Sequence, residues 1–407
     1  MNVTYFNLEE TKMKTFNVKL LYLYKFIGQC LPIYAFYQIL FIERGKTFTQ
    51  VAVLIALWSV FTIVFEVPAG ILADRWNRRN MLAMATVLQG LCFIIWFFSF
   101  TFLMFALGFV FWGIASAFVS GTEEGLVYDN LKHDGVEEKF TEVYGKAKFY
   151  ETIGSLVGIA SAGVIVRFID IPTIALLSAI VCFVNVLLVF QLREKNYYSE
   201  QSDKESGFFE TFKGASKFIK GNTIALVAIL FFVMFASIGS YLDEFDAFIV
   251  NDFQLNNSWV SVILTVRFIF VAVGDLLAPH VQKRILSVRQ VFLISGFACV
   301  LLLIFAVIWH QFAILIFGVA FMITAIAEIL LVNTLQNEIK EEGRATVMSF
   351  CGIGQNLVMI CFSLMYALLA GFFTLQQVYL IISIYGIVGG IVFFMLSKIL
   401  KIKKVRD

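Results

Sequence analysis

The chain has 407 residues, of which 60% are hydrophobic and only 15% are charged, and its mean hydropathy is +0.86. Soluble globular proteins carry about 25% charged residues, so this composition excludes an ordinary soluble protein and predicts a membrane protein. The net charge of +2 is too small to indicate a nucleic-acid partner.

Apolar segments follow one another along the whole chain. A helix needs roughly 20 apolar residues to cross a hydrocarbon core of about 30 Å. The segments are continuous rather than alternating, so they predict helices and not a β-barrel. Twelve spans are expected, at residues 17–42, 49–73, 80–100, 102–127, 150–169, 172–192, 222–250, 258–279, 288–309, 311–335, 345–370 and 376–398.

The distribution of basic residues indicates the orientation of these spans. With both termini in the cytoplasm, 26 of the 31 Lys and Arg fall in cytoplasmic segments, and the external loops hold only Arg44, Lys46 and Arg167. This asymmetry follows the positive-inside rule. We therefore expect an all-α integral membrane protein with twelve transmembrane helices and cytoplasmic N and C termini.

A polar interval at 193–221 divides the expected spans into two groups of six, at 1–192 and 222–407. Within the interval, apolar residues from Phe208 to Ile219 recur at helical spacing between lysines, which is typical of an amphipathic helix at a membrane surface. Two six-helix bundles joined by a cytoplasmic linker are therefore expected. A regulatory binding site in the linker is the alternative.

The segment between the second and third spans, residues 66–80, reads EVPAGILADRWNRRN. It resembles the loop signature G-x-L-A-D-R-x-G-R-K of the major facilitator superfamily, with Asn77 at the place of the second glycine. Together with the twelve-span pattern, the resemblance covers the whole chain and implies that family's fold. The matching positions are Gly70, Leu72, Ala73, Asp74, Arg75, Arg78 and Arg79.

The resemblance implies that the 66–80 motif stabilises the outward-facing state. Asp74 is expected to face the positive N-terminal end of the eleventh span at Arg344, and Arg78 is expected to pair with Asp129 at the end of the fourth span. Gly70 is expected to let two helices approach. In the second half, GDLLAPHVQKR has Ala278 at the place of Asp74, so the motif is degenerate there.

Ionisable residues inside spans cost roughly 2.5–3.5 kcal/mol each to insert, so they are candidates for function. Arg267 is the deepest, and its expected partner is a carboxylate of the seventh span, Glu328, or an anionic group of a substrate. Asp243 and Asp246 are close enough for one to carry a proton. The alternative is that these acids, with Glu244, cap the span in water.

The first span carries a polar stripe of Tyr22, Lys25 and Gln29, which should face a bundle interior unless Lys25 extends to the interface. The resemblance implies a cavity lined by spans 1, 2, 4, 5, 7, 8, 10 and 11. The candidate substrate and proton residues are therefore Lys25, Gln29, Asp243, Glu244, Asp246, Arg267, Glu328, Gln355 and Asn356. Interface or packing roles are expected for Glu66, Glu123, Glu124 and Glu151, and helix packing for Gly154, Gly158 and Ala162.

The predicted function is secondary active transport, as a proton-coupled exporter of a small amphipathic compound similar to bacterial drug/proton antiporters. The same scaffold also serves uptake or export of a metabolite, siderophore, peptide or lipid. An enzyme is disfavoured because no catalytic cluster stands out, and a receptor because it has no need of the 66–80 motif. Scattered histidines indicate no metal or cofactor. A monomer in a bacterial inner membrane is expected, with a small-molecule substrate, protons and lipids as partners.

Overall fold

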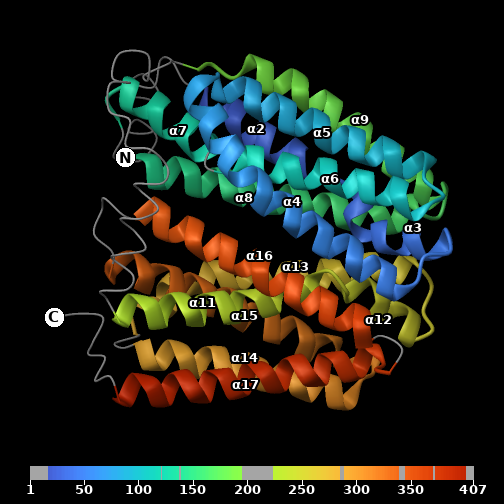
Figure 1. The fold of residues 1–407 in the computed structure, drawn as a ribbon, viewed down its shortest axis with the longest axis vertical. Coiled ribbons are helices and arrows are strands. Elements are labelled where there is room, and N and C mark those ends of the chain that lie inside the picture. The colour runs from blue at the N-terminus through green and yellow to red at the C-terminus, as the bar shows by residue number, and fades with distance from the viewer. Residues whose placement is uncertain are drawn as a thin grey trace, which may run out of the picture. The chain divides into compact units, whose positions relative to one another are not determined.

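The computed structural model describes residues 17–120, 122–136, 139–194, 223–284, 288–338, 344–369 and 372–399. Every regular element in these ranges is a helix (Figure 1). Contacts within the chain divide it into unit 1, Met1–Lys46 with Leu57–Glu205, and unit 2, Thr47–Ala56 with Ser206–Asp407. The predicted amphipathic helix near Phe208 lies outside the described residues.

Unit 1 is a bundle in which α5 packs against α6 and α9, and α2 packs against α8. Its elements are α2 (Val18–Gln29), η1 (Pro32–Ala35), α3 (Tyr37–Glu43), most of α4 (Phe48–Arg75), α5 (Arg78–Phe98), α6 (Phe102–Val119), α7 (Thr122–His133), α8 (Phe140–Ile165) and α9 (Ile171–Gln191).

The first predicted span is not one helix. α2 ends at Gln29, and Pro32 then begins the short 3₁₀ helix η1 before α3 starts at Tyr37. Proline lacks a backbone N–H and clashes with the preceding turn, so it favours the start of a helix over its interior. In membrane proteins such interrupted helices commonly lie at binding sites.

The 66–80 motif is mostly helical, because the helix of the second span extends two residues beyond its predicted end at residue 73. α4 continues through Pro68 to Arg75, and only Trp76 and Asn77 separate it from α5. Leucine and alanine inside the motif are strong helix formers, and membrane helices tolerate proline when neighbouring groups satisfy the freed carbonyl.

Unit 2 is a second bundle, in which α13 packs against α15, α14 packs against α15 and α17, and α11 packs against α15, α16 and α17. A turn at Glu244 and Phe245 interrupts the seventh predicted span. The elements are α11 (Thr223–Asp243), α12 (Asp246–Asp252), α13 (Ser258–Gln282), α14 (Val288–Ile308), η4 (Gln311–Ala313), α15 (Ile314–Glu338), α16 (Arg344–Leu369) and α17 (Leu375–Ile399).

Ten helices among the described residues are long and apolar enough to cross a membrane, against twelve predicted spans. The two other predicted spans are the interrupted first one and the fifth, α8, which carries charged residues such as Lys148 and Glu151 in its first half.

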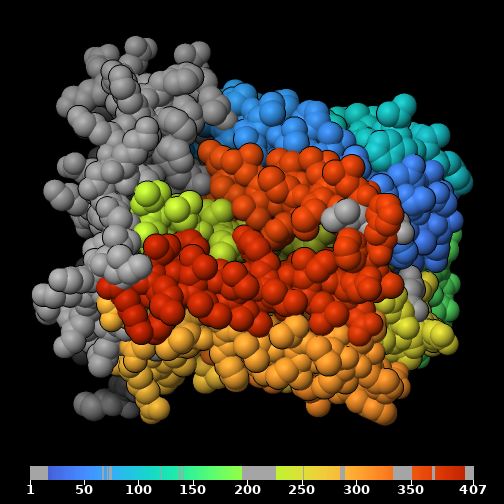
Figure 2. All heavy atoms as spheres, turned by 60° about the horizontal axis from the view of Figure 1, so that its bottom comes forward, coloured from blue at the N-terminus to red at the C-terminus, as the bar shows by residue number. Residues whose placement is uncertain are grey.

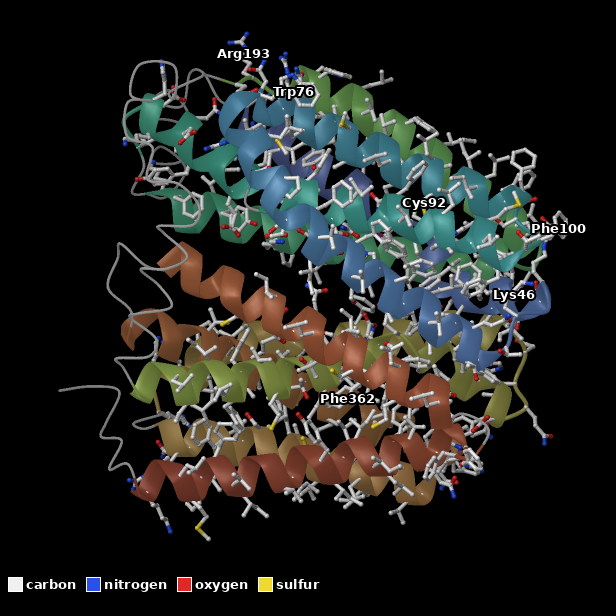
Figure 3. All side chains as sticks on the ribbon, viewed as in Figure 1. Lys46, Trp76, Cys92, Phe100, Arg193 and Phe362 are labelled. Atoms are coloured by element: carbon white, nitrogen blue, oxygen red, sulfur yellow. The ribbon has the colours of Figure 1, made fainter. Side chains whose placement is uncertain are left out.

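Within unit 1, Trp76 and Arg193 lie at one end of the bundle and Lys46 and Phe100 lie at the other (Figure 3). The chain is a multi-pass membrane protein.

The outer face of α17 is apolar and exposed, which is typical of a helix that contacts lipid. Ile384, Val388 and Ile391 are 50%, 52% and 53% exposed, and they recur at helical spacing along α17. Figure 2 shows this C-terminal helix, in red, at the surface of the molecule. An exposed apolar stripe of this kind is disfavoured in water and favoured against lipid chains.

Close packing of α8 on α2 depends on glycine. A Cβ on Gly154 would collide with the carbonyl oxygen of Phe26, and a Cβ on Gly158 would lie 2.6 Å from the backbone nitrogen of Leu31. Small residues at this spacing let helix backbones touch. This contact holds Glu151 on α8 close to Lys25 on α2.

We predict that Gly154→Ala lowers the thermal stability of the purified protein, because the added methyl meets backbone atoms that cannot move alone. The expected loss is about 1–3 kcal/mol, as for an overpacked core. The control is Gly145→Ala on the same helix, where a Cβ has no neighbour within 4 Å in the described structure. Equal melting temperatures for the two variants would contradict the close contact.

Candidate functional site

A cavity of about 280 Å³ lies inside unit 1. Its lining comes from α2, η1, α5, α6, α7, α8 and α9, that is, from segments far apart in the sequence. Spans three and six, which are α5 and α9, thus take part through Thr86, Gln89 and Asn185. The resemblance implied a cavity without these two spans, so the described cavity differs from the predicted one: it lies within one bundle.

Lys25 is the charged centre of the cavity. The Lys25 side chain is 7% exposed, and its Nζ lies 2.8 Å from Glu123 and 2.5 Å from Glu151. These contacts join α2, α7 and α8. Lys25 therefore does not extend to the membrane interface, which was the alternative prediction. Burying an ammonium group without such partners would be costly.

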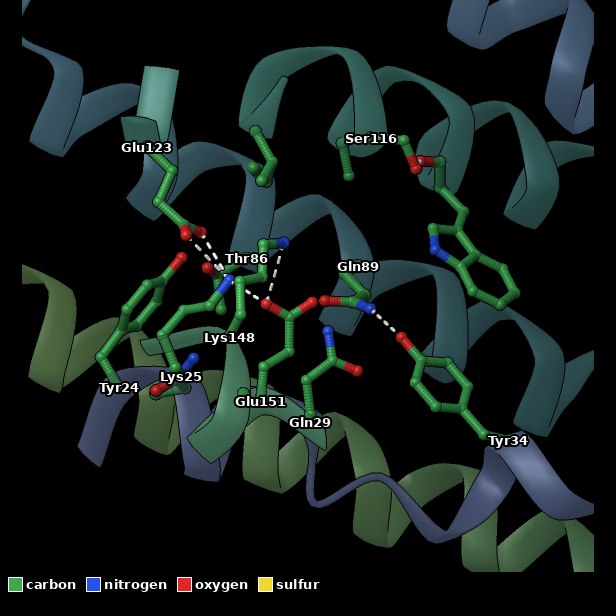
Figure 4. Close-up of a pocket in the computed structure, with 16 residues that line it drawn as sticks. Tyr24, Lys25, Gln29, Tyr34, Thr86, Gln89, Ser116, Glu123, Lys148 and Glu151 are labelled. Atoms are coloured by element: carbon green, nitrogen blue, oxygen red, sulfur yellow. Dashed lines mark hydrogen bonds and ion pairs between the residues drawn. The ribbon is translucent and has the colours of Figure 1, made fainter. Parts of the chain in front are cut away.

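The charges that line the cavity balance. Lys148 lies 3.1 Å from Glu151 and is 52% exposed. The charged lining residues are thus two lysines, Lys25 and Lys148, and two glutamates, Glu123 and Glu151. Figure 4 shows Glu151 between the two lysines, with Gln29 and Gln89 beside this cluster.

The other end of the cavity is aromatic and uncharged. Gln89 Nε2 donates a 2.6 Å hydrogen bond to the hydroxyl of Tyr34 (Figure 4). The ring of Tyr34 stacks on Trp112, with centroids 5.5 Å apart and planes at 8°. Tyr34 reaches this position because η1 follows the break at Pro32. Such a surface suits a flat solute that also makes hydrogen bonds.

Unit 2 holds a second buried cation between two acids. Arg267 Nε lies 3.0 Å from Asp246, and Arg267 Nη2 contacts Asp243. The side chains of Arg267 and Asp246 are 6% and 0% exposed, whereas Asp243 is 45% exposed. The turn between α11 and α12 lets both acids reach α13. The structure thus brings together Arg267 and two of its predicted partners.

Tyr379 completes this cluster. Its hydroxyl donates a 2.7 Å hydrogen bond to Asp246 Oδ1, and the Arg267 guanidinium lies 4.6 Å from the ring of Phe268 and 5.1 Å from that of Phe321. Aromatic faces stabilise a desolvated cation. One positive and two potential negative charges meet here, so this group has one carboxylate more than its cation balances.

The 66–80 motif makes the contact expected of Arg78. Arg78 Nη1 lies 2.6 Å from Asp129 Oδ2 on α7. The Glu194 carboxylate also accepts hydrogen bonds from the backbone N–H groups of Arg78, at 2.7 Å, and of Arg79, at 3.1 Å. An acid at the start of a helix satisfies free N–H groups and the helix dipole, and sequence alone gave no signal for Glu194.

The other predicted contacts of the motif are not seen among the described residues. The side chains of Asp74, Arg75 and Arg344 lie outside the described residues. A Cβ on Gly70 would meet no atom within 4 Å in the described structure. The predicted approach of two helices at Gly70 is therefore not seen.

The remaining predicted residues of unit 2 are not brought to the Arg267 cluster by any described contact. Glu328 is half-buried on α15, and Gln355 and Asn356 are half-buried on α16. Asn356 donates to the Gly352 carbonyl of its own helix at 3.0 Å. Glu244 lies in the turn after α11 and is half-buried.

The family follows from the comparison with known sequences. Residues 22–335 match the sequence pattern of the Major Facilitator Superfamily. The chain belongs to this superfamily. It is also 33% identical over 64 residues to the uncharacterized MFS-type transporter YfkF of Bacillus subtilis (strain 168), a match that covers 16% of this chain and only 15% of that relative.

Several solved transporter structures share the fold of this chain over nearly its whole length. The nucleoside transporter NupG has a TM-score of 0.75 at 15% identity, covering 94% of this chain and 99% of NupG. The D-xylose-proton symporter has a TM-score of 0.71 at 11% identity, over 92% of this chain and 94% of the symporter. A bacterial homolog of the human lysosomal transporter Spinster scores 0.70 at 15%, over 95% and 97%. These likenesses show the fold. The superfamily match over residues 22–335 makes the chain a transporter by family, and not an enzyme.

Several cavity residues were not predicted from the sequence. Glu123 and Glu151 were assigned to interface or packing roles, although a buried Lys25 requires acids nearby. Gln89 and Asn185 are uncharged amides in spans three and six, and such residues give only a weak signal. Tyr34 could have been found from Pro32, which marks the interruption of the first span.

We predict that Lys25→Met destabilises unit 1 by about 3–5 kcal/mol, because it leaves Glu123 buried without a counter-charge. Adding Glu123→Gln should restore most of the loss, and thermal unfolding in detergent measures both. The control is Lys146→Met on α8, which breaks an exposed pair with Glu142 at 2.6 Å.

The Lys146 contact lowers the pKa of Glu142 through a hydrogen bond and charge attraction. Exposed pairs contribute little to stability, so the control should melt like the wild type. An equal loss in the Lys25 and Lys146 variants would contradict the buried role of Lys25.

Proposed function

We propose that the chain is a proton-coupled secondary transporter that carries a small polar organic solute by exposing a binding cavity alternately to the two sides of the membrane. The observation that supports this most is the unit 1 cavity, which combines balanced charges, two glutamine amides and a stacked aromatic pair. A ligand pocket usually joins an apolar surface to a few placed polar groups.

The size of the cavity favours a metabolite over a drug. Pockets for drug-sized ligands measure roughly 300–1,000 Å³, and about 280 Å³ lies at the lower limit. The polar lining also favours a solute with several hydrogen-bonding groups. Solved relatives of this fold carry the names of a nucleoside transporter and a D-xylose-proton symporter, which are compatible with this class.

Proton coupling is assigned to the Arg267 cluster. Its two carboxylates face one cation, and Asp246 is completely buried. A buried carboxylate in excess of its counter-charges is stabilised by taking up a proton. Release of that proton would leave the excess charge uncompensated, so the protonation state can bias which conformation of the carrier is favoured.

The Arg78–Asp129 pair is proposed to act with Asp74 as a conformational motif. Arg78 is fixed by Asp129 through its side chain and by Glu194 through its backbone. Asp74 would then be presented to the start of α16 in the outward-facing state. Loss of this contact should shift the carrier toward its inward-facing state.

Two transport modes stay predictions: export of an amphipathic compound, which the sequence favours, and uptake of a polar metabolite. Transport assays in reconstituted vesicles with an imposed pH gradient distinguish these two modes. Labelled uridine and D-xylose are the polar probes, and ethidium is the amphipathic one. Movement of a polar probe from the acidic to the alkaline side of the membrane, together with protons, supports proton symport. Movement of ethidium alone, against the direction of proton flow, supports antiport. Failure of every probe to move faster than in empty vesicles would contradict a carrier.

We predict that Asp246→Asn reduces pH-driven accumulation at least tenfold while solute exchange at equal pH persists, because the variant can no longer gain or lose the proton. Exchange also shows that the variant is folded. Asp252→Asn is the control, since Asp252 is exposed at the other end of α12 and contacts Trp309. Wild-type accumulation in Asp246→Asn would show that the proton binds elsewhere.

A further inference from the structure

Tyr379 is the contribution of α17 to the Arg267 cluster. Tyr379 and Asp246 are both 0% exposed, and the Tyr379 hydroxyl donates to Asp246 Oδ1 at 2.7 Å. Because bulk water does not reach either side chain in the described structure, it does not offer this oxygen another donor. The charge state of Asp246 therefore depends on the Tyr379 hydroxyl.

The ring of Tyr379 is fixed by aromatic packing. Its centroid lies 5.3 Å from that of Trp309, 6.0 Å from that of Phe305 and 6.3 Å from that of Phe317. These rings come from α14, from the residue that follows it and from α15. Aromatic contacts of this kind add to the free energy gained by burial. The position of the hydroxyl is thus set by the packing of the ring as well as by its hydrogen bond.

The helix that carries Asp246 is attached to this aromatic group at both ends. Asp246 is the first and Asp252 the last residue of α12, which has seven residues. Asp252 Oδ2 accepts a 3.2 Å hydrogen bond from Trp309 Nε1, and Trp309 itself packs on Tyr379. The distance between Asp246 and the Tyr379 hydroxyl is therefore well constrained in this conformation.

Three neighbours act on the charge of Asp246: Asp243 from α11, Arg267 from α13 and Tyr379 from α17. Burial and a nearby negative charge favour a protonated acid, whereas a cation and a donated hydrogen bond favour the carboxylate. Arg267 is shared with Asp243, so its charge is divided between two acids. The Tyr379 hydroxyl adds stabilisation of the Asp246 carboxylate that the shared cation does not supply.

A carrier must release its coupled proton in every cycle, and a buried acid without donors holds its proton tightly. We propose that Tyr379 is a positioning residue of the proton site, whose donated hydrogen bond weakens the hold of Asp246 on the coupling proton. This inference rests on the proposed function, because it takes Asp246 as the proton site. It goes further by naming the group that sets the pH at which the proton leaves.

Infrared difference spectroscopy of the purified full chain tests this role without a transported solute. A protonated carboxyl group has its own C=O stretching band, and the pH at which this band is half-formed is the midpoint of proton binding. The band that disappears in Asp246→Asn belongs to Asp246.

Two substitutions at Tyr379 should move this midpoint in opposite directions. Tyr379→Phe keeps the ring and removes the donor, so the midpoint should rise by about one pH unit, which is tenfold tighter proton binding. Tyr379→3-fluorotyrosine keeps both the ring and the hydroxyl. Because fluorine makes the phenol a stronger donor, the midpoint should fall.

Tyr385→Phe is the control on the same helix. The Tyr385 ring packs on Phe362, with centroids 5.3 Å apart, and Tyr385 is half-buried. Removing its hydroxyl should leave the midpoint of the wild type. If Tyr379→Phe does not fold, the downward shift in the fluorotyrosine variant decides alone.

A purely structural role of Tyr379 would not give opposite shifts. A wild-type midpoint in a folded Tyr379 variant, or shifts of the same sign in both, would overturn its role and leave Asp246 as the proton site. A band that survives in Asp246→Asn would instead overturn the proposed proton site, and the role of Tyr379 with it. The two failures are therefore distinguishable.

Discussion

A buried cation held between two carboxylates is the interaction on which both units depend. In unit 1, Lys25 joins α2 to the acids of α7 and α8, and in unit 2, Arg267 joins α13 to the acids beside the turn between α11 and α12. A charge inside a membrane bundle must find its counter-charge within the protein. The helices that carry these groups are therefore constrained to lie together.

The two clusters differ in their charge balance, and this difference supports a division of roles. The cavity cluster includes a second lysine, Lys148, so its charges sum to zero. The Arg267 cluster has an additional carboxylate and a tyrosine donor. The first arrangement suits an uncharged solute, and the second suits a proton. A carrier that binds the two in different units needs a conformational change to couple them, and the 66–80 motif is the proposed control of that change.

Much of the fold could be predicted from the sequence because the bilayer imposes it. Long apolar runs gave most of the spans, and the GILADR segment with Arg78 gave the family. The break at Pro32 and the turn after Asp243 were missed, because hydropathy does not distinguish one continuous helix from two short ones. These interruptions matter, since they place Tyr34 in the cavity and Asp246 beside Arg267.

The charged residues of the candidate sites could be predicted from the sequence, because a buried charge requires a partner. The amide residues that line the cavity could not. Arg267 pairs with two acids of the seventh span, one of the three kinds of partner expected for it. Asn185 and Gln89 carry no charge and lie in spans that the resemblance did not assign to a cavity. Glu194 was missed because it caps α5 from a distant segment. Such contacts depend on tertiary packing, and no spacing in the sequence encodes them.

Infrared difference spectroscopy of the purified protein during a pH change tests the central claim most directly, because a protonated carboxyl group has its own C=O stretching band. The account predicts a band from one buried carboxylic acid in the wild type that disappears in Asp246→Asn and persists in Asp252→Asn. A wild-type spectrum without such a band, or a band that survives in Asp246→Asn, would contradict it.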